Sequence, residues 1–268
     1  MEIYASGLMA VEGRDAREAE MSVTSSPRIV TTSWDDGDPS DMRIAELLAA
    51  RKIKGTFYVP VERYRPCGRM TPADLRSLAG QGFEIGAHGV SHANLALCNP
   101  GRLAFEVEHS KATLEDTLGQ EVRVFAYPRG RYNQSVIAAL QRAGFAGART
   151  TRMFRHGFDF STFEMPTSIQ VYPHSRSDYM RNLVRGLYFG GSWKYVVRPQ
   201  AAGNWADLAV LLLDNSLAQG GVWHLYGHSW EIRQLDLWKD LERVLAYAAA
   251  RKGVHYLSNG EVLDRFAN

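Results

Sequence analysis

Apolar and polar positions along the first half of the chain predict strands and helices in regular succession. Short runs of β-branched and apolar residues are typical of strands, and apolar residues spaced three or four apart are typical of helices. The predicted strands of this half are residues 28–34, 55–60, 83–89, 122–128 and 145–151. The predicted helices between them are residues 41–52, 71–82, 100–119 and 133–144. This alternation implies parallel strands joined by helical crossovers.

The second half of the chain has a less regular pattern. Its predicted strands are residues 168–173, 221–228 and 254–258. Its predicted helices are residues 177–189, 206–219 and 236–253. About eight strands, with a helix after most of them, favour an α/β fold of the (β/α) barrel type, and an open doubly wound sheet is the alternative. No internal repeat or linker divides the chain, so we expect one domain over residues 27–268 after a loosely ordered extension over residues 1–26.

Composition and charge narrow the class of protein. The chain has 268 residues, of which 45% are hydrophobic, enough to bury a full core. A net charge of +2 gives no reason to expect nucleic acid as a partner. Cys67 and Cys98 are the only cysteines, too few for a disulfide framework. The longest apolar run, residues 208–213, is too short for a transmembrane segment, and residues 1–26 lack the pattern of a signal peptide. We therefore expect a cytoplasmic protein, and the sequence leaves its oligomeric state open.

The most polar short motifs all follow predicted strands. They are "WDDG" (34–37), "HGVSH" (88–92), "YPRGRYN" (127–133) and "HLYGHSWE" (224–231). In parallel α/β folds, functional residues collect at the carboxyl ends of the strands. We therefore expect the four motifs to converge on one pocket.

Two of these motifs together predict a metal site. His88 and His92, four residues apart, would share one face of a helical turn and bind one ion, although buried, hydrogen-bonded histidines are the alternative. Asp35 and Asp36 are adjacent acids before Gly37, and Asp-Gly is also a common turn. Two imidazoles and one carboxylate form a three-ligand set with open positions for water and substrate. Because successive side chains leave a strand in opposite directions, one Asp can bind the metal while its neighbour points toward the water bound to that metal.

These motifs resemble those of the polysaccharide deacetylases of the NodB-homology type (carbohydrate esterase family 4), over about residues 27–263. "SWDDG" matches the first motif of that family. "HGVSH" matches its His-(Ser/Thr)-x-x-His motif, with Gly89 where Ser or Thr is usual, and "FAYPRG" matches its third motif loosely. The resemblance implies a distorted (β/α) barrel and hydrolysis of an acetyl group, most simply N-acetyl, on a carbohydrate substrate.

The resemblance also implies roles for individual residues. Asp35 would be the catalytic base, and the backbone N–H of Arg129 would help to stabilise the oxyanion. The ligands of a divalent metal would be Asp36, His88 and His92. Zinc suits this set of two histidines and one aspartate, and cobalt, nickel, iron or manganese would also fit.

A late histidine would protonate the leaving group in the family mechanism, and the sequence offers two. His224 and His228 would face the same side of their strand. We favour His228 because it lies nearer the carboxyl end, where the pocket is expected; His224 would then be a buried histidine with a neighbouring hydrogen-bond partner.

The chain departs from the family in the residues that support the base and the acid. Ala126 stands where the family has an arginine that orients the catalytic aspartate, and Arg129 or Arg131 is a candidate replacement. The aspartate that steadies the catalytic histidine has no clear counterpart, and Glu164 or Glu231 is a candidate for that role.

Aromatic residues near the motifs are candidates for sugar binding. Tyr127 and Trp230, with Arg129, are the predicted substrate-binding residues, and Trp34 and Tyr132 are further candidates that ordinary core packing would also explain. The alternatives to an N-deacetylase are an acetyl esterase, a deformylase or ureide hydrolase on the same scaffold, and a non-catalytic carbohydrate-binding barrel.

Overall fold

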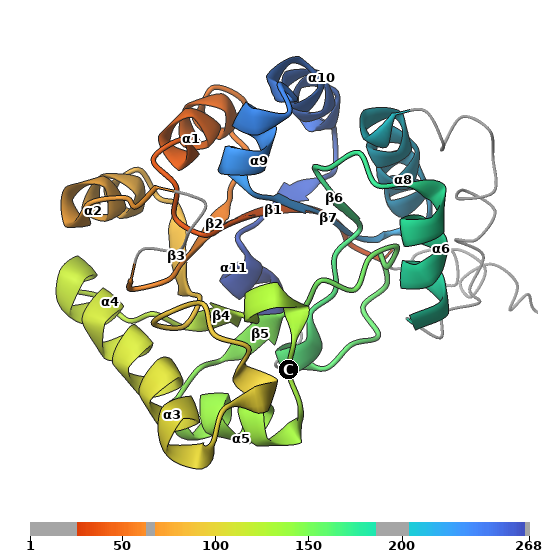
Figure 1. The fold of residues 1–268 in the computed structure, drawn as a ribbon. Coiled ribbons are helices and arrows are strands. Elements are labelled where there is room, and N and C mark those ends of the chain that lie inside the picture. The colour runs from red at the N-terminus through yellow and green to blue at the C-terminus, as the bar shows by residue number, and fades with distance from the viewer. Residues whose placement is uncertain (1–25, 63–67, 186–203, 266–268) are drawn as a thin grey trace, which may run out of the picture.

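The structure is a computed structural model, and it describes residues 26–62, 68–185 and 204–265. Within these residues, eight parallel strands form one curled sheet with helices around its outer side (Figure 1). The strands are β1 (Arg28–Asp35), β2 (Thr56–Val59), β3 (Glu84–Ala87), β4 (Val124–Ala126), β5 (Gly147–Arg149), β6 (Ile169–Gln170), β7 (Gly221–Gly227) and β8 (His255–Tyr256). The predicted extension over residues 1–26 lies outside the described residues apart from Ser26, as does Cys67.

Most helices cover the outer side of the sheet between successive strands. They are α1 (Asp41–Ala49), α2 (Pro72–Gly80), α3 (Pro100–Ala104), α4 (Ser110–Leu118), α5 (Gln134–Arg142), α6 (Arg176–Arg185), α8 (Trp205–Gln219), α9 (Ser229–Gln234), α10 (Trp238–Ala248) and α11 (Asn259–Asp264). A π-helical turn, Phe105–His109, joins α3 to α4 into the long helix predicted for residues 100–119. The short helices α9 and α11 were not predicted.

Strand β1 lies at the centre of the sheet, whose order is β5-β4-β3-β2-β1-β7-β6. One edge of β1 pairs with β7 from Arg28 to Trp34. Its other edge pairs first with β8, at Ile29 and Val30, and then with β2 from Ser33 onwards. This central position places the acids that end β1 in the middle of the carboxyl edge of the sheet.

The barrel is distorted because its two edge strands, β5 and β6, do not pair with each other to close it. A single bridge, from Arg149 to Met165, follows β5, and the backbone N–H of Ser168 donates to His224 in β7. An irregular segment after β5 therefore fills the gap before β6. The predicted distorted, parallel (β/α) barrel is confirmed, and the doubly wound alternative is wrong.

The start of α2 has a clear local signal in the sequence. Thr71 caps α2, its side chain accepting a hydrogen bond from the N–H of Asp74, and Pro72 occupies the first helical position.

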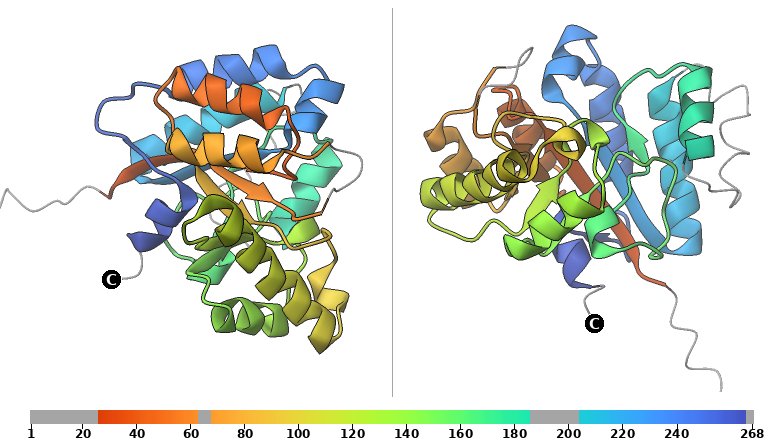
Figure 2. Two further views of the ribbon diagram at one scale, coloured as in Figure 1. Left: turned by 90° about the vertical axis from the view of Figure 1, so that its left-hand side faces the viewer. Right: turned by 60° about the horizontal axis from the view of Figure 1, so that its bottom comes forward.

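At the far end of the sheet, α11 lies beside the start of β1, away from the loops that follow the strands (Figure 2). One end of the barrel is thus covered by a helix, and the end at which the polar motifs lie is left for the site. No helix of the described residues is long and apolar enough to cross a membrane.

Candidate active site

All eight predicted site residues line one pocket at the carboxyl ends of the strands. The volume of this pocket is about 420 Å³. Its lining comes from the carboxyl ends of the strands, from the loops that follow them, and from α6 and α9. The predicted residues that it brings together are Asp35, Asp36, His88, His92, Tyr127, Arg129, His228 and Trp230. The roles assigned to them remain predictions, and the geometry below states what each can do.

Asp36, His88 and His92 form a buried cluster with the chemistry of a metal site. Their candidate ligand atoms all lie within 4.8 Å of one another. Oδ1 of Asp36 is 3.5 Å from Nε2 of His88 and 3.3 Å from Nε2 of His92. Nδ1 of His88 lies 2.8 Å from the carbonyl oxygen of Ala126, a contact in which the ring donates. That contact turns Nε2 of His88 toward Asp36, and Nε2 is then the nitrogen that would hold a metal ion. The three residues therefore fit a divalent ion.

The ionisation of the cluster also suits a metal. Burial raises the pKa of Asp36, but the hydrogen bond with His88 and the nearby imidazoles outweigh it and hold that pKa well below its usual value. Burial and the neighbouring His88 lower the pKa of His92 to about 3. A carboxylate and a neutral imidazole are the forms that bind metal.

The predicted helical turn for "HGVSH" is wrong. The segment is an irregular loop, in which Gly89 has φ 75° and His92 has φ 56°. These left-handed conformations, rather than a helical face, bring the two rings to a centroid distance of 4.8 Å.

Glu106 holds this loop and was not predicted. Its side chain is fully buried on the π-helical turn. One carboxylate oxygen accepts from the N–H groups of Val90 and Ser91 at 2.7 and 2.9 Å. The hydroxyl of Ser91 and the guanidinium of Arg102 donate to the other oxygen. A Cβ on Gly89 would lie 3.1 Å from Glu106, so a Ser or Thr there would crowd that carboxylate and strain the left-handed backbone.

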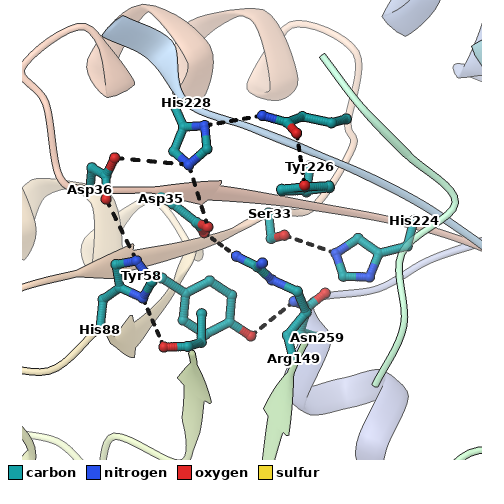
Figure 3. Close-up of polar contacts among 12 residues, drawn as sticks. Ser33, Asp35, Asp36, Tyr58, His88, Arg149, His224, Tyr226, His228 and Asn259 are labelled. Carbon is teal, nitrogen blue, oxygen red and sulfur yellow. Dashed lines mark hydrogen bonds and ion pairs between the residues drawn. The ribbon is translucent and has the colours of Figure 1, made fainter. Parts of the chain in front are cut away.

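Asp35 ends β1 and forms an ion pair with Arg149 at the end of β5 (Figure 3). Arg149 is fully buried, and its guanidinium lies 5.2 Å from the ring centre of Tyr58 and 4.9 Å from that of Tyr226. Burial raises the pKa of Asp35, but Arg149 and the nearby imidazoles outweigh it and keep the pKa below its usual value. The carboxylate is therefore ionised and held in one direction.

The prediction that Arg129 or Arg131 replaces the orienting arginine is wrong. Arg131 is exposed and does not line the pocket, and Arg149 makes the contact with Asp35. The available signal was a lone arginine at the end of the apolar strand "FAGARTT".

His228 lies in the pocket, and His224 lies beneath it. Nε2 of His228 is 3.9 Å from Oδ2 of Asp35 and 3.8 Å from Oδ2 of Asp36. The backbone of Asp36 has φ 80° and no longer follows the extended path of β1. Both acids therefore face His228, and the expectation that they point in opposite directions is wrong. His224 is buried between Ser33, at 2.8 Å from its Nε2, and the carbonyl of Pro166, at 3.0 Å from its Nδ1. Burial lowers the pKa of His224 to about 3, so it is a neutral histidine of the barrel interior.

Glu231, rather than Glu164, supports His228. Its Oε2 is 2.6 Å from Nδ1 of His228, while Glu164 accepts from the hydroxyl of Tyr132. Burial lowers the pKa of His228, but the hydrogen bond with Glu231 and the charges of the nearby acids outweigh it and raise that pKa to about 9. Gln170 in β6 lies beside the pair, with its amide nitrogen 3.2 Å from Glu231.

The predicted aromatic residues differ in their access to the pocket. Trp34 is fully buried, so of the two roles left open for it the structure shows core packing and not sugar stacking. Trp230 lines the pocket and donates its indole N–H to Oδ2 of Asp36 at 2.9 Å. Tyr127 lines the pocket with its hydroxyl donated to Phe163, and its ring stacks on Tyr132 at a centroid distance of 4.4 Å.

The N-terminal half of the chain matches a known family in sequence. Residues 22–148 match the family model described as polysaccharide deacetylase. YxkH, a candidate polysaccharide deacetylase of Bacillus subtilis (strain 168), is 24% identical over 140 residues, which are 50% of this chain and 50% of that protein. The chain thus spans about half the length of this curated relative. The residues that match the family model include Asp35, Asp36, His88 and His92.

Solved structures match most of the chain in fold. A candidate polysaccharide deacetylase of Mycobacterium smegmatis gives a TM-score of 0.67 at 16% identity, over 90% of each chain. The chitin deacetylase of the fungal pathogen Colletotrichum lindemuthianum gives a TM-score of 0.58 at 15% identity, over 88% of each chain. At such identities the likeness shows the fold alone. Together with the family match, it confirms the resemblance predicted from the motifs.

Proposed function

We propose that this chain, which resembles the polysaccharide deacetylases in sequence and fold, is a metal-dependent hydrolase that removes an acetyl group from a carbohydrate. One observation carries the proposal. A buried Asp-His-His cluster shares its pocket with a carboxylate fixed by Arg149 and an imidazole fixed by Glu231. A binding protein has no need of a base and an acid held by separate partners around a metal site.

Asp36, His88 and His92 would hold the ion, for which zinc is the first choice given two nitrogen ligands and one oxygen ligand. When bound, a divalent ion supplies Lewis-acid polarisation of the acyl carbonyl and a more acidic water. Trp230 and Ala126 hold two of the three ligands in place through the hydrogen bonds described above, which favours one ligand geometry.

Asp35 acts as the general base in this proposal. Its carboxylate is ionised and points into the pocket, so it can accept a proton from the attacking water. Arg149 prevents the carboxylate from rotating away and favours its charged form, because a guanidinium binds a carboxylate strongly in a buried setting.

His228 acts as the general acid. Because Nδ1 is bound to Glu231, the proton available for transfer lies on Nε2, the nitrogen that faces the pocket. A raised pKa means that the imidazolium is present at neutral pH, ready to protonate a departing amine.

The backbone N–H of Arg129 is the proposed oxyanion donor. Arg129 has φ 58°, a left-handed conformation that turns this loop at the pocket wall. Among the described residues, no backbone acceptor is found for its N–H, whereas the next two N–H groups bond to Tyr127 and Pro128. A donor left open at a pocket is suited to a developing negative charge.

Release of the acyl group as a free acid tests the proposal. We would incubate the zinc-loaded protein with N-acetylated and O-acetylated sugars and with an N-formylated sugar, and measure acetate and formate. The proposal predicts acetate release from N-acetyl sugars, lost in Asp35→Asn and kept in the surface control Asp207→Asn. Dominant formate release would favour a deformylase. Dominant cleavage of O-acetyl sugars would favour an esterase, and sugar binding without any release would favour a non-catalytic barrel.

A further inference from the structure

We propose that the substrate carries an anionic group, a carboxylate or a phosphate, close to its acetyl group, and that the guanidinium of Arg129 binds it. This inference rests on the proposed function, because it concerns the substrate of the same pocket. It concerns the side chain of Arg129, whereas the oxyanion role belongs to its backbone.

The charges of the pocket wall show why this arginine is distinctive. Asp35 is paired with Arg149, and His228 is paired with Glu231. Asp36 lies against the two imidazoles of the cluster. Among the charged side chains of the described pocket wall, Arg129 alone has neither an ion pair nor a hydrogen bond to another part of the described chain.

The backbone around Arg129 is fixed rather than loose. Arg129 and Gly130 both have left-handed φ values, of 58° and 62°. A Cβ on Gly130 would lie only 2.1 Å from the hydroxyl of Thr151, so this turn packs tightly on the segment after β5. Other non-glycine residues, such as Lys52 and Ala250, share this conformation, but Arg129 adopts it in the wall of the pocket, where such strain gives a reason to look for function. The turn thus presents the Arg129 side chain beside the cluster, on the same pocket wall as His92.

The chemistry of the guanidinium identifies the kind of group that it binds. Five N–H donors in a planar fork match the paired oxygens of a carboxylate or a phosphate. A neutral sugar offers hydroxyl groups, which leave the positive charge unpaired. A pocket of about 420 Å³ has room for one sugar ring with such a substituent.

Binding to the metal-free protein tests this inference without turnover. We would measure by calorimetry the affinities of N-acetylglucosamine, its 1-phosphate, and N-acetylmuramic acid, which carries a carboxylate. The inference predicts that at least one anionic sugar binds about tenfold to a hundredfold more tightly than the neutral one, as expected for a charge-assisted hydrogen bond. The two anionic sugars distinguish phosphate from carboxylate.

Arg129→Gln should remove this difference in affinity, and Arg129→Lys should keep part of it, because lysine retains the charge but not the fork. Arg131→Gln is the matched control, since Arg131 lies two residues away and outside the pocket wall, and it should keep the whole difference. Equal affinities for neutral and anionic sugars in the wild type, or equal losses in both glutamine variants, would overturn the inference.

Turnover separates this inference from the proposed function. With zinc present, the ratio of kcat/KM for anionic over neutral sugars should fall toward one in Arg129→Gln and stay high in Arg131→Gln. Cleavage of neutral sugars with no anionic preference would overturn the inference and leave the proposed function standing. Arg129-dependent binding of anionic sugars without cleavage of any sugar would support the inference and contradict the proposed function.

Discussion

The two sides of the pocket are built in different ways. On the side of β1 to β4, the strands pair continuously, and the metal-binding candidates follow β1 and β3 in short motifs. On the side of β5 to β7, the sheet is interrupted, and the supporting residues Arg149, Gln170 and Glu231 come from three separate elements.

The histidine loop and the base differ in how far away along the chain their supporting partners lie. On the first side, Glu106 holds a loop that lies 15 and 16 residues before it. On the second side, Asp35 and Arg149 are 114 residues apart. The loop of the two metal-binding histidines is therefore held by a nearby segment, whereas the base depends on a partner across the barrel. Each side also holds a contact of the other kind, since Trp230 reaches Asp36 across 194 residues and Glu231 lies three residues from His228. Substitutions on the first side should change metal affinity, and those on the second side should change turnover while metal stays bound.

The largest effect is expected from His88→Ala. Removing one of three ligands should abolish tight zinc binding. Turnover should then fall by about a thousandfold or more, because proton removal by the base and stabilisation of the developing charge both need the bound metal. Zinc content after dialysis and acetate release would be measured on the same sample. His109→Ala, an exposed histidine, is the control. Tight zinc binding by His88→Ala would contradict the assignment of the ligands.

Arg149→Lys should lower kcat by about tenfold to a hundredfold with little change in zinc affinity, since lysine keeps the charge but loses the fork that orients Asp35. Arg149→Met should also lower the free energy of unfolding, by about 3–5 kcal/mol, because it leaves Asp35 buried without a partner.

The matched control for this pair is Arg123→Lys, which alters an exposed arginine–aspartate pair with Asp264. Its effect on unfolding should stay below about 1 kcal/mol. An unchanged kcat in Arg149→Lys would show that Asp35 needs no orienting partner.

Glu106→Gln should weaken zinc binding by about tenfold to a hundredfold, the usual cost of losing an outer partner of a metal site. Competition with a zinc chelator would measure the affinity. Glu108→Gln, on the exposed face of the same turn, should leave it unchanged. If both variants bind zinc like the wild type, Glu106 supports the fold and not the site.

Glu231→Gln should change how stability depends on pH in the metal-free protein. The pKa of His228 is raised to about 9, so its contribution to stability is complete below the unfolded pKa of about 6.5 and is lost as pH rises through about 9. Losing the carboxylate of Glu231 should lower that pKa and move the loss of stability to lower pH. NMR titration of the imidazole and urea unfolding at several pH values would measure both. The prediction fails if His228 has the same pKa in the wild type and in Glu231→Gln.

The smallest effect is expected from Gly89→Ala. Both Gly89 (φ 75°) and Gly82 (φ 85°) have left-handed backbones, but a Cβ on Gly89 would lie 3.1 Å from Glu106, whereas a Cβ on Gly82 would meet nothing within 4 Å. Each change should cost about 1–2 kcal/mol of backbone strain. Only Gly89→Ala should also weaken zinc binding. Chelator competition on both variants would show whether the contact with Glu106 matters to the metal.

Much of the fold and the chemistry of the site could be predicted from sequence. Hydrophobic spacing predicted the alternating elements, because strands buried on both sides and helices with one apolar face leave distinct patterns. The motifs at strand ends predicted eight of the residues that line the pocket, because parallel strands bring their carboxyl ends together. The left-handed turns at His92 and Arg129 could not be predicted from residue spacing, which does not reveal φ. Arg149 was missed because its partner lies on a distant strand and depends on the curvature of the sheet.

Zinc content and acetate release, measured together on wild type, Asp35→Asn and His88→Ala, test the central claim most directly. Each protein would be stripped with a chelator, reloaded with zinc and given an acetylated sugar that the wild type cleaves. The account predicts that His88→Ala loses both zinc and turnover, while Asp35→Asn keeps one zinc per chain and loses turnover. Undiminished turnover in Asp35→Asn, or by a wild type free of metal, would contradict the claim that these residues form a metal-dependent hydrolase site.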